Sequence, residues 1–343
     1  MISFESDYNN GAHPKVLQHL IDTNSEQSAS YGYDRWSQQA KEKIRLASQL
    51  NSNADIFFLT GGTQANATVI DALLPSYAAA IATTTAHINV HESGAIEATG
   101  HKVITLPSHQ GRMHADELHA YLNAFFNDPT WEHMAVPGLV YVTFPTEMGT
   151  IYTAEELEDI HIVCKHYQLP LFIDGARMGY GLMAEGCDIT LPWLAAHCEA
   201  FYIGGTKVGA LCGEAVVFPK GAPRGFFTMV KRHGALLAKS RIAGVQFDAL
   251  FTDNLYMDIS RHAVNMAMRM RKLFANAGLT IKDSPTNQQF VLLNQQQQQA
   301  LSKHVLFEPW EPVDNVYTLY RFVTSWATTD DDLQVLANAI NTL

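Results

Sequence analysis

Between residues 54 and 218, short runs of β-branched and aromatic residues alternate with longer stretches of helical character, and this alternation limits the folds that the chain can adopt. Several of the short runs are apolar throughout, as strands are when both faces of their sheet are covered. We therefore expect an α/β protein with a mainly parallel sheet sandwiched by helices. A capping pattern at the start of 153–168 predicts one of these helices. Six runs are predicted as strands: 54–60, 79–85, 138–144, 169–175, 200–205 and 214–219.

The C-terminal part of the chain has a different pattern, which begins near Gln246. Apolar residues at intervals of three and four over 263–277 predict a long amphipathic helix, and its methionines are interpreted as core residues rather than as a binding groove. Two strand-like runs follow, QQFVLL and VYTLYRFVTSW. A last helix is predicted from near Thr329, because three acidic residues in its first turn suit a helix N-terminus.

The length of the chain predicts two domains. A chain of 343 residues is too long for one simple core and suits one large and one small domain. We predict a large ligand-binding domain over residues 1–245 and a smaller α+β domain over residues 246–343. The N-terminal segment, residues 1–25, is expected to pack on the small domain or at a contact between subunits.

The charge balance excludes two classes of partner. Lys and Arg number 23 against 34 Asp and Glu, which gives a net charge of −11 with neutral histidine. Nucleic acids and anionic membranes attract a cationic face, so we expect neither as a partner. No apolar run reaches the ~18 residues of a membrane helix, and the first residues lack the pattern of a signal peptide. Four cysteines without CxxC spacing are interpreted as free thiols, and we expect a soluble cytoplasmic protein.

Asp174 ends the apolar run LPLFIDG. A carboxylate at the C-terminal end of a parallel strand points into the crevice where α/β proteins bind ligands. Burying it without a cationic partner would be unfavourable. Arg177 is one candidate for that partner. The other is the protonated pyridine nitrogen of a bound cofactor, which such an ion pair keeps cationic as an electron sink.

Lys207 lies between two apolar runs and is surrounded by glycines. It is either a residue of a surface loop or a buried amine. Desolvation lowers the pKa of a lysine, and a neutral amine is nucleophilic enough to form an imine. Asp174 and Lys207 are separated by about one helix and one return strand, so we expect both to face the same crevice.

A third element is the segment FFLTGGTQANATVI. Its strand ends at Thr60, two glycines form the turn, and a helix starts near Thr63, so that free N–H groups can bind phosphate. The spacing fits neither the dinucleotide fingerprint nor the P-loop. Together with Asp174 and Lys207, this turn would hold the phosphate, ring nitrogen and aldehyde carbon of pyridoxal 5′-phosphate (PLP).

His87 and His91 have a spacing that would place both on one helical face. A zinc pair is disfavoured because no third ligand is evident, so no metal is expected. A core or surface histidine is a second interpretation. We favour a third, in which His87 stacks on a planar cofactor ring and handles protons near neutral pH.

These motifs, in this order, resemble those of the L-threonine aldolases, which belong to the beta-eliminating lyase group of fold-type I PLP enzymes with the aspartate-aminotransferase fold. The resemblance runs over nearly the whole chain, and D-G-A-R combined with the lysine loop is its most specific part. It is carried by the segments FESDY, SYGYD, GGTQAN, AHINVHE, LFIDGARM, GGTKVGALCGEAVV and YRFVTSW.

The resemblance implies a role for each matching residue. Lys207 would hold PLP as a Schiff base, Asp174 would pair with the pyridine nitrogen, and His87 would stack on the ring. Arg241 would reach the phosphate of a neighbouring subunit. The implied cofactor-binding set is Gly62, Thr63, His87, Asp174, Arg177, Thr206, Lys207 and Arg241. The implied set for the substrate carboxylate is Ser6, Arg177 and Arg321, because bidentate guanidinium groups suit carboxylates.

The implied reaction is retro-aldol cleavage of L-threonine or L-allo-threonine to glycine and an aldehyde. The alternative is a PLP-dependent β-eliminating lyase or aminotransferase that acts on another amino acid. Fold-type I sites usually lie between subunits, so a homodimer or homotetramer is implied. Threonine aldolases with an E-N-T-H-N segment have a second active-site histidine in that segment. This chain has VTFPTEMGT instead, with Pro145 at the position of the histidine. His87, Glu147 or a water is then left to act as the base for the β-hydroxyl group.

Overall fold

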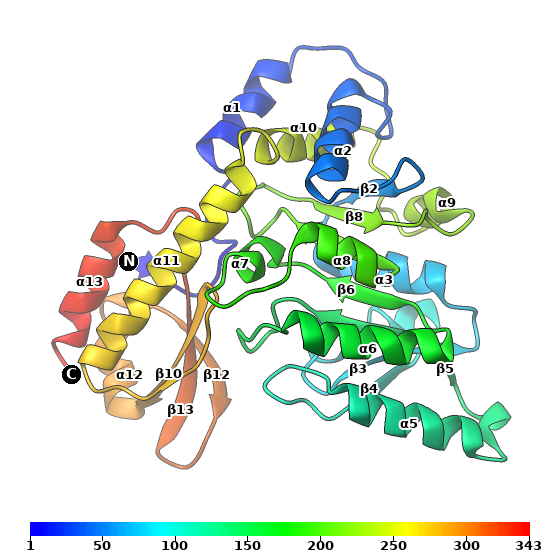
Figure 1. Cartoon of the computed structure of the whole chain (residues 1–343). Helices are drawn as coiled ribbons and strands as arrows, with labels where there is room; N and C mark the ends of the chain where they lie inside the picture. The colour runs from blue at the N-terminus through cyan, green and yellow to red at the C-terminus, as the bar shows by residue number, and fades with distance from the viewer.

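The computed structural model describes the whole chain, residues 1–343, and is built around a seven-stranded sheet (Figure 1). The strand order is β2-β8-β7-β6-β5-β3-β4. All neighbours from β7 to β4 are parallel, whereas β8 runs antiparallel to β7 and β2. The strands are β2 (Asp55–Leu59), β3 (Ala78–Thr83), β4 (Val103–Leu106), β5 (Val136–Thr143), β6 (Leu171–Asp174), β7 (Ala200–Gly204) and β8 (Glu214–Phe218).

The expected α/β class, the mainly parallel sheet and all six predicted strands are confirmed. The sequence pattern missed β4, which lies at one edge of the sheet. Its residues alternate between buried and more exposed positions, so β4 lacks the continuous apolar run of a strand that is covered on both faces.

Helices cover both faces of the sheet, and successive residues of β6 show how the two layers form. Leu171 and Ile173 pack in one apolar cluster with α5 (Ala115–Asn127), α6 (Ala154–Tyr167) and α8 (Leu191–His197). Phe172 points to the opposite face, where the cluster includes residues of α3 (Gly62–Leu73) and α9 (Phe226–Arg232). Asp174 follows Phe172 by two residues, so it shares the face that α3 covers.

The C-terminal part of the chain forms a separate antiparallel sheet. Helix α11 (Leu255–Asn276) leads to it from the large sheet (Figure 1), and its Met266 and Met270 are buried, which confirms the long helix and its core methionines. The strand order is β12-β13-β10-β9. The elements are β9 (Ile281–Lys282), β10 (Gln288–Asn294), α12 (Gln295–Leu301), β11 (Val305–Leu306), β12 (Glu308–Pro312), β13 (Tyr317–Val323) and α13 (Asp330–Ile340).

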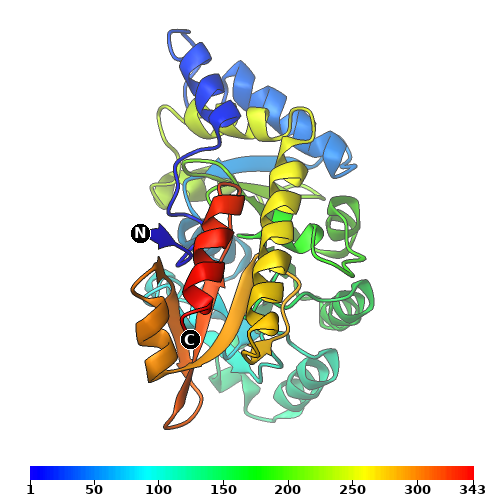
Figure 2. The same ribbon diagram turned by 90° about the vertical axis from the view of Figure 1, so that its left-hand side faces the viewer.

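The N-terminus packs on this C-terminal part. Strand β1 (Ile2–Ser3) pairs with β11, and Phe4 is buried in the same apolar cluster as residues of α13, beside which the N-terminus lies in Figure 2. The predicted start of α13 is confirmed, because Thr329 and Asp332 form a reciprocal cap. A cap of the same kind begins α6 at Thr153.

The remaining helices surround the large sheet. These helices are α1 (Pro14–Thr23), α2 (Arg35–Ala47), α4 (His87–Val90), α7 (Met178–Leu182), α10 (Arg241–Leu250) and the short 3₁₀ helices Glu97–Thr99 and Trp131–His133. None of the helices in the chain is both long and apolar enough to cross a bilayer.

The predicted domain boundary at 245/246 falls inside α10, and the division into two domains stays a prediction.

Candidate active site

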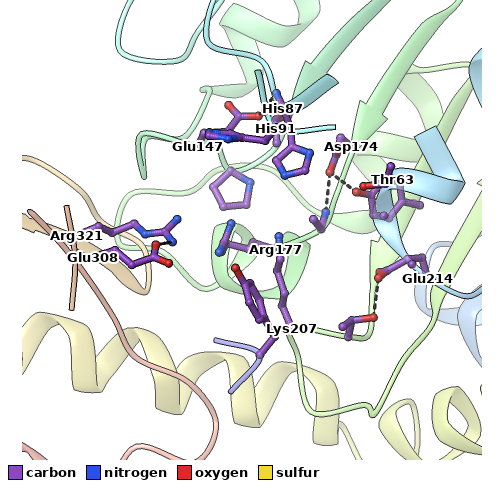
Figure 3. Close-up of a pocket in the computed structure, with 18 of the residues that line it drawn as sticks. Thr63, His87, His91, Glu147, Asp174, Arg177, Lys207, Glu214, Glu308 and Arg321 are labelled. Atoms are coloured by element: carbon purple, nitrogen blue, oxygen red, sulfur yellow. Dashed lines mark hydrogen bonds and ion pairs between the residues drawn. The ribbon is translucent and has the colours of Figure 1, made fainter. Parts of the chain in front are cut away.

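A cavity of about 740 Å³ lies where the C-terminal ends of the central parallel strands face β12 and β13. Figure 3 shows Glu308 and Arg321 on one side of it, Asp174, Thr63 and Glu214 on the other, and Lys207 and Arg177 between them. The cavity brings together most of the residues that the sequence singled out: Gly62, Thr63, His87, Asp174, Arg177, Thr206, Lys207 and Arg321.

Asp174 is held at the end of β6 by four hydrogen-bond donors. The amide of Asn66 (2.9 Å) and the hydroxyl of Tyr141 (2.6 Å) donate to Oδ2. The hydroxyl of Tyr202 (2.5 Å) and the N–H of Ala176 (2.9 Å) donate to Oδ1. Burial raises the pKa of both tyrosines well above the usual value, so they remain neutral donors. These contacts fix the direction of a carboxylate that points into the cavity.

Lys207 lies in the turn between β7 and β8, and its amine is directed into the cavity rather than toward bulk water. The hydroxyl of Tyr180 donates to its backbone carbonyl (2.5 Å) and so fixes the turn. Burial lowers the pKa of the Lys207 amine to about 8, and the nearby cation of Arg177 acts in the same direction. A substantial fraction of this amine is therefore neutral and nucleophilic near physiological pH.

The N-terminus of α3 supplies the part of the cavity suited to a phosphate. The backbone of Gly61 is extended, α3 begins at Gly62, and both residues line the cavity with Thr63. A Cβ atom at Gly62 would lie 3.1 Å from the hydroxyl of Tyr202, so a larger residue would press on a donor to Asp174. The glycine thus permits a close approach of helix and strand, and the free N–H groups of the first turn remain available to an anion.

A chain of hydrogen bonds connects His87 to Asp174. Nδ1 of His87 lies 2.7 Å from Oε1 of Glu92, and the same oxygen accepts from the amide of Asn66 (2.7 Å). That amide also donates to Asp174. The imidazole is therefore held in a fixed orientation at the cavity wall. His91 lies beside it, with 5.5 Å between the ring centroids, and no third metal-type ligand joins the two histidines.

Arg177 forms its ion pair with Asp7 rather than with Asp174. Nε and Nη2 of Arg177 donate to the two carboxylate oxygens of Asp7 at 2.7 and 3.0 Å, and Asn287 donates to Asp7 at 2.9 Å. Burial opposes ionisation of Asp7, but the cations of Arg177 and Lys207 outweigh it and lower the pKa of the carboxyl group. The pair orients the guanidinium toward the cavity.

Arg321 lies on β13 at the opposite wall. It forms an ion pair with Glu308, donates to the side chain of Gln288 (3.2 Å) and stacks over Trp310, with 4.7 Å from its Cζ to the ring centroid. Burial lowers the pKa of its guanidinium, as does the positive charge of Arg177. Two arginines from different parts of the chain thus face one cavity.

Two residues of the predicted site lie outside the cavity lining. The hydroxyl of Ser6 donates to Asn9 (2.6 Å). The guanidinium of Arg241 donates to the carbonyl oxygens of Thr23 (2.5 Å) and Glu26 (2.7 Å). The role implied for Arg241 concerns a neighbouring subunit, and the roles of both residues stay predictions.

Glu147 lies in the loop that follows β5, two residues after Pro145. Its Oε1 accepts from the hydroxyl of Thr143 (2.7 Å) and from the backbone N–H of His87 (2.9 Å), whereas its buried Oε2 has no partner. Thr143 ends β5 and is the register partner of Asp174 on β6, so its hydrogen bond holds Glu147 close to the strand end that carries Asp174. Burial raises the pKa of this carboxyl group.

Comparison with known proteins agrees with this geometry. The sequence profile of the beta-eliminating lyases matches residues 4–296. The chain belongs to the beta-eliminating lyase family. Members of this family are PLP-dependent enzymes, and so is this chain.

Two similar proteins are threonine aldolases. The structure of a threonine aldolase from Leishmania major is 36% identical and has a TM-score of 0.96, and the match covers 100% of this chain and 99% of that one. A low-specificity L-threonine aldolase from a Pseudomonas species is 29% identical over 80% of this chain and 78% of its own length. An aspartate aminotransferase from Thermus thermophilus, 14% identical with a TM-score of 0.72 over 100% of this chain and 92% of its own, shares the fold.

The residues of the cavity fit the cofactor of this family. Three groups surround one space of about 740 Å³: a lysine amine with a lowered pKa, a carboxylate fixed by four donors, and a helix N-terminus. These groups match the aldehyde, the pyridine nitrogen and the phosphate of PLP. Sequence reasoning missed the groups that support them, namely Asn66, Tyr141, Tyr202, Glu92 and Asp7. Tyr141 and Tyr202 were detectable as hydroxyl-bearing residues inside otherwise apolar strands.

Proposed function

We propose that the chain catalyses retro-aldol cleavage of L-threonine, L-allo-threonine and related β-hydroxy-α-amino acids to glycine and an aldehyde. The observation that carries this proposal is one cavity that combines Lys207 and Asp174 with two arginines and an unpartnered carboxylate oxygen of Glu147. The likeness over the full chain to the Leishmania major threonine aldolase supports it.

In this proposal Lys207 holds PLP covalently, Asp174 faces its pyridine nitrogen, and Gly62, Thr63 and Thr206 hold its phosphate. When bound, PLP supplies an electron sink for the pair released when the Cα–Cβ bond breaks. The tyrosine and asparagine donors keep Asp174 directed at the ring. His87 is held by Glu92 at the wall, where its imidazole can cover one face of the ring.

Arg177 and Arg321 bind the substrate carboxylate. Asp7 orients Arg177 through two hydrogen bonds and leaves Nη1 of that guanidinium for the substrate. Arg321 is paired with Glu308 in this structure, so a substrate carboxylate competes with Glu308 for the same guanidinium. Binding at both arginines places the Cα substituents between the C-terminal ends of the central strands and the wall formed by β12 and β13.

Glu147 is the base for the β-hydroxyl group in this proposal. Both carboxylate oxygens of Asp174 and both of Glu214 accept hydrogen bonds, and Glu308 is paired with Arg321, whereas Glu147 accepts at Oε1 alone. Oε2 of Glu147 is buried and free to accept a proton. Its raised pKa makes it a stronger base than an ordinary carboxylate.

A homodimer or homotetramer with shared active sites and a cytoplasmic location complete the proposal. The loop that carries Tyr31 (40% exposed) and Tyr33 (68% exposed) offers two aromatic rings to a second subunit. All four cysteines are free thiols, which suits a reducing compartment. Analytical ultracentrifugation of the purified protein measures the oligomeric state.

The proposed reaction is tested with purified protein that carries PLP. We expect L-threonine and L-allo-threonine each to release acetaldehyde, followed by coupling to alcohol dehydrogenase and NADH, and the ratio of the two rates to report selectivity at Cβ. Preparations from which PLP has been removed are the control. If the loaded protein released no aldehyde but transferred the amino group of a substrate to an oxo acid, it would be an aminotransferase.

Arg321→Ala is expected to weaken the binding of glycine by roughly 10- to 150-fold, because a charged hydrogen bond contributes about 1.5–3 kcal/mol. The change in cofactor absorbance on addition of glycine measures the dissociation constant. Glu308→Gln is the matched control, since it removes the competing carboxylate and is expected to raise the affinity. An unchanged affinity in Arg321→Ala would exclude Arg321 from the carboxylate site.

A further inference from the structure

Glu214 is a buried acid in the part of the cavity assigned to phosphate. It begins β8, is 3% exposed and lines the cavity with Gly62 and Thr63. Its Oε1 accepts from the hydroxyl of Thr206 (2.8 Å), and its Oε2 accepts from the N–H of Gly205 (3.1 Å). Figure 3 marks a contact of Glu214 with a dashed line. An ionised carboxylate at this place would repel the phosphate dianion of PLP.

The hydroxyl of Thr206 also limits how an ionised Glu214 and a phosphate can be bound together. A hydroxyl group has one donor proton and two acceptor sites. The N–H of Gly213 occupies one acceptor site (3.1 Å), and the proton is directed at Glu214. An ionised carboxylate can only accept hydrogen bonds. The Thr206 hydroxyl then has to donate its one proton to Glu214 and cannot donate it to a phosphate oxygen. A protonated Glu214 would instead donate to the second acceptor site of Thr206 and free the Thr206 proton.

We propose that Glu214 is protonated when the cofactor is bound and acts as a positioning residue, donating a hydrogen bond to Thr206 so that the Thr206 hydroxyl turns toward the phosphate. In this arrangement each group has a partner: Gly205 donates to Glu214, Glu214 and Gly213 donate to Thr206, and Thr206 donates to the phosphate. The inference rests on the PLP dependence of the family and not on the identity of the reaction.

The groups around Glu214 favour the protonated form. Burial raises the pKa of its carboxyl group to about 8, with the cation of Lys207 acting against the shift and Asp174 adding to it. Tyr202 on β7 and Tyr256 on α11 also face Glu214, and burial raises their pKa values, so neither brings a charge. A phosphate dianion in the cavity raises the pKa of Glu214 further. Binding therefore takes up a proton, and affinity falls as pH rises above the pKa of the free protein.

The test uses full-length protein freed of PLP and the probe pyridoxine 5′-phosphate, which has no aldehyde to react with Lys207. Dissociation constants are measured by calorimetry from about pH 7 to about pH 10, where the phosphate is dianionic. Glu214→Gln is the matched variant, because its amide donates to Thr206 at every pH and its oxygen still accepts from Gly205. Lys207 titrates in both proteins, and its pKa also depends on the charge of Glu214, so pyridoxine is measured beside the phosphate probe to remove the contribution of Lys207 from the ratio of the two affinities.

We expect this ratio, variant over wild type, to rise by up to tenfold per pH unit above about pH 8. Pyridoxine, which lacks the phosphate, is expected to show a ratio that changes with pH only through Lys207. The same pH dependence in both proteins would overturn the proposal, whether or not the enzyme cleaves threonine.

A second measurement needs no variant. Calorimetry of the wild-type protein at about pH 9, in buffers that differ in ionisation enthalpy, counts the protons taken up on binding. We expect pyridoxine 5′-phosphate to take up about one proton more than pyridoxine. Equal proton uptake for the two probes would show that Glu214 does not change its protonation with the phosphate, and would overturn the proposal.

Discussion

Lys207→Ala is expected to abolish aldehyde release from threonine together with the visible absorbance that a covalently held cofactor gives the purified protein. Lys207 is the lysine that lines the cavity, and burial lowers the pKa of its amine to about 8. Alanine removes the nucleophile and leaves no other amine within this lining to replace it. The absorbance spectrum and the coupled aldehyde assay measure the two losses separately.

Two further variants separate chemistry from charge and folding. Lys207→Arg keeps a positive charge in the cavity, but guanidinium does not form an imine, so this variant is expected to be as inactive as the alanine variant. Lys220→Ala changes an exposed lysine just after β8 and is expected to keep both absorbance and activity. Full activity in Lys207→Ala would contradict the assignment of the site.

Strands were predictable where both of their faces are buried, because such strands have continuous apolar sequences. β3, β6 and β7 are buried along their whole length, and continuous apolar runs are what such strands require. The edge strand β4 has no such run and was missed. The capped starts of α6 and α13 were predictable because a cap is a local arrangement of residues three apart.

Asp174, Lys207 and the Gly62–Thr63 turn were predictable because each lies at or shortly after the C-terminal end of a strand with an apolar run. His87, Arg177 and Arg321 were predicted as site residues from the resemblance of their segments to the threonine aldolases.

The supporting contacts depend on tertiary structure. Tyr141 reaches Asp174 because β5 and β6 pair in one register, which the sequence of either strand does not reveal. Asp7 meets Arg177 across 170 positions of sequence, and Glu308 enters the cavity from the C-terminal sheet. Contacts between residues so far apart in the sequence arise from tertiary packing, so no local sequence pattern predicts them.

Glu147→Gln is expected to slow threonine cleavage by roughly 10²- to 10⁴-fold, the range that general-base catalysis contributes. Glutamine keeps the size of the side chain, and its oxygen can still accept from Thr143 and from the N–H of His87. What it loses is the ability to take a proton at Oε2, the buried oxygen without a partner. The rate of aldehyde release at saturating threonine measures the effect.

The pH profile distinguishes this role from a structural one. A base must be ionised, and burial raises the pKa of Glu147, so wild-type activity should fall as pH drops through that raised pKa. The acid limb due to Glu147 should be absent from the profile of Glu147→Gln. A variant damaged only in packing would instead keep the wild-type profile at a lower rate.

A reaction that involves no β-hydroxyl group provides the internal control. Exchange of the glycine α-proton with solvent deuterium, followed by NMR, needs the cofactor, Lys207 and the carboxylate site but no proton transfer from Cβ. Glu147→Gln is therefore expected to retain this exchange while losing threonine cleavage. If both reactions fell equally, Glu147 would support the site as a whole. If neither fell, His87 or a water would be the base, because these are the groups left beside Glu147 to accept the proton.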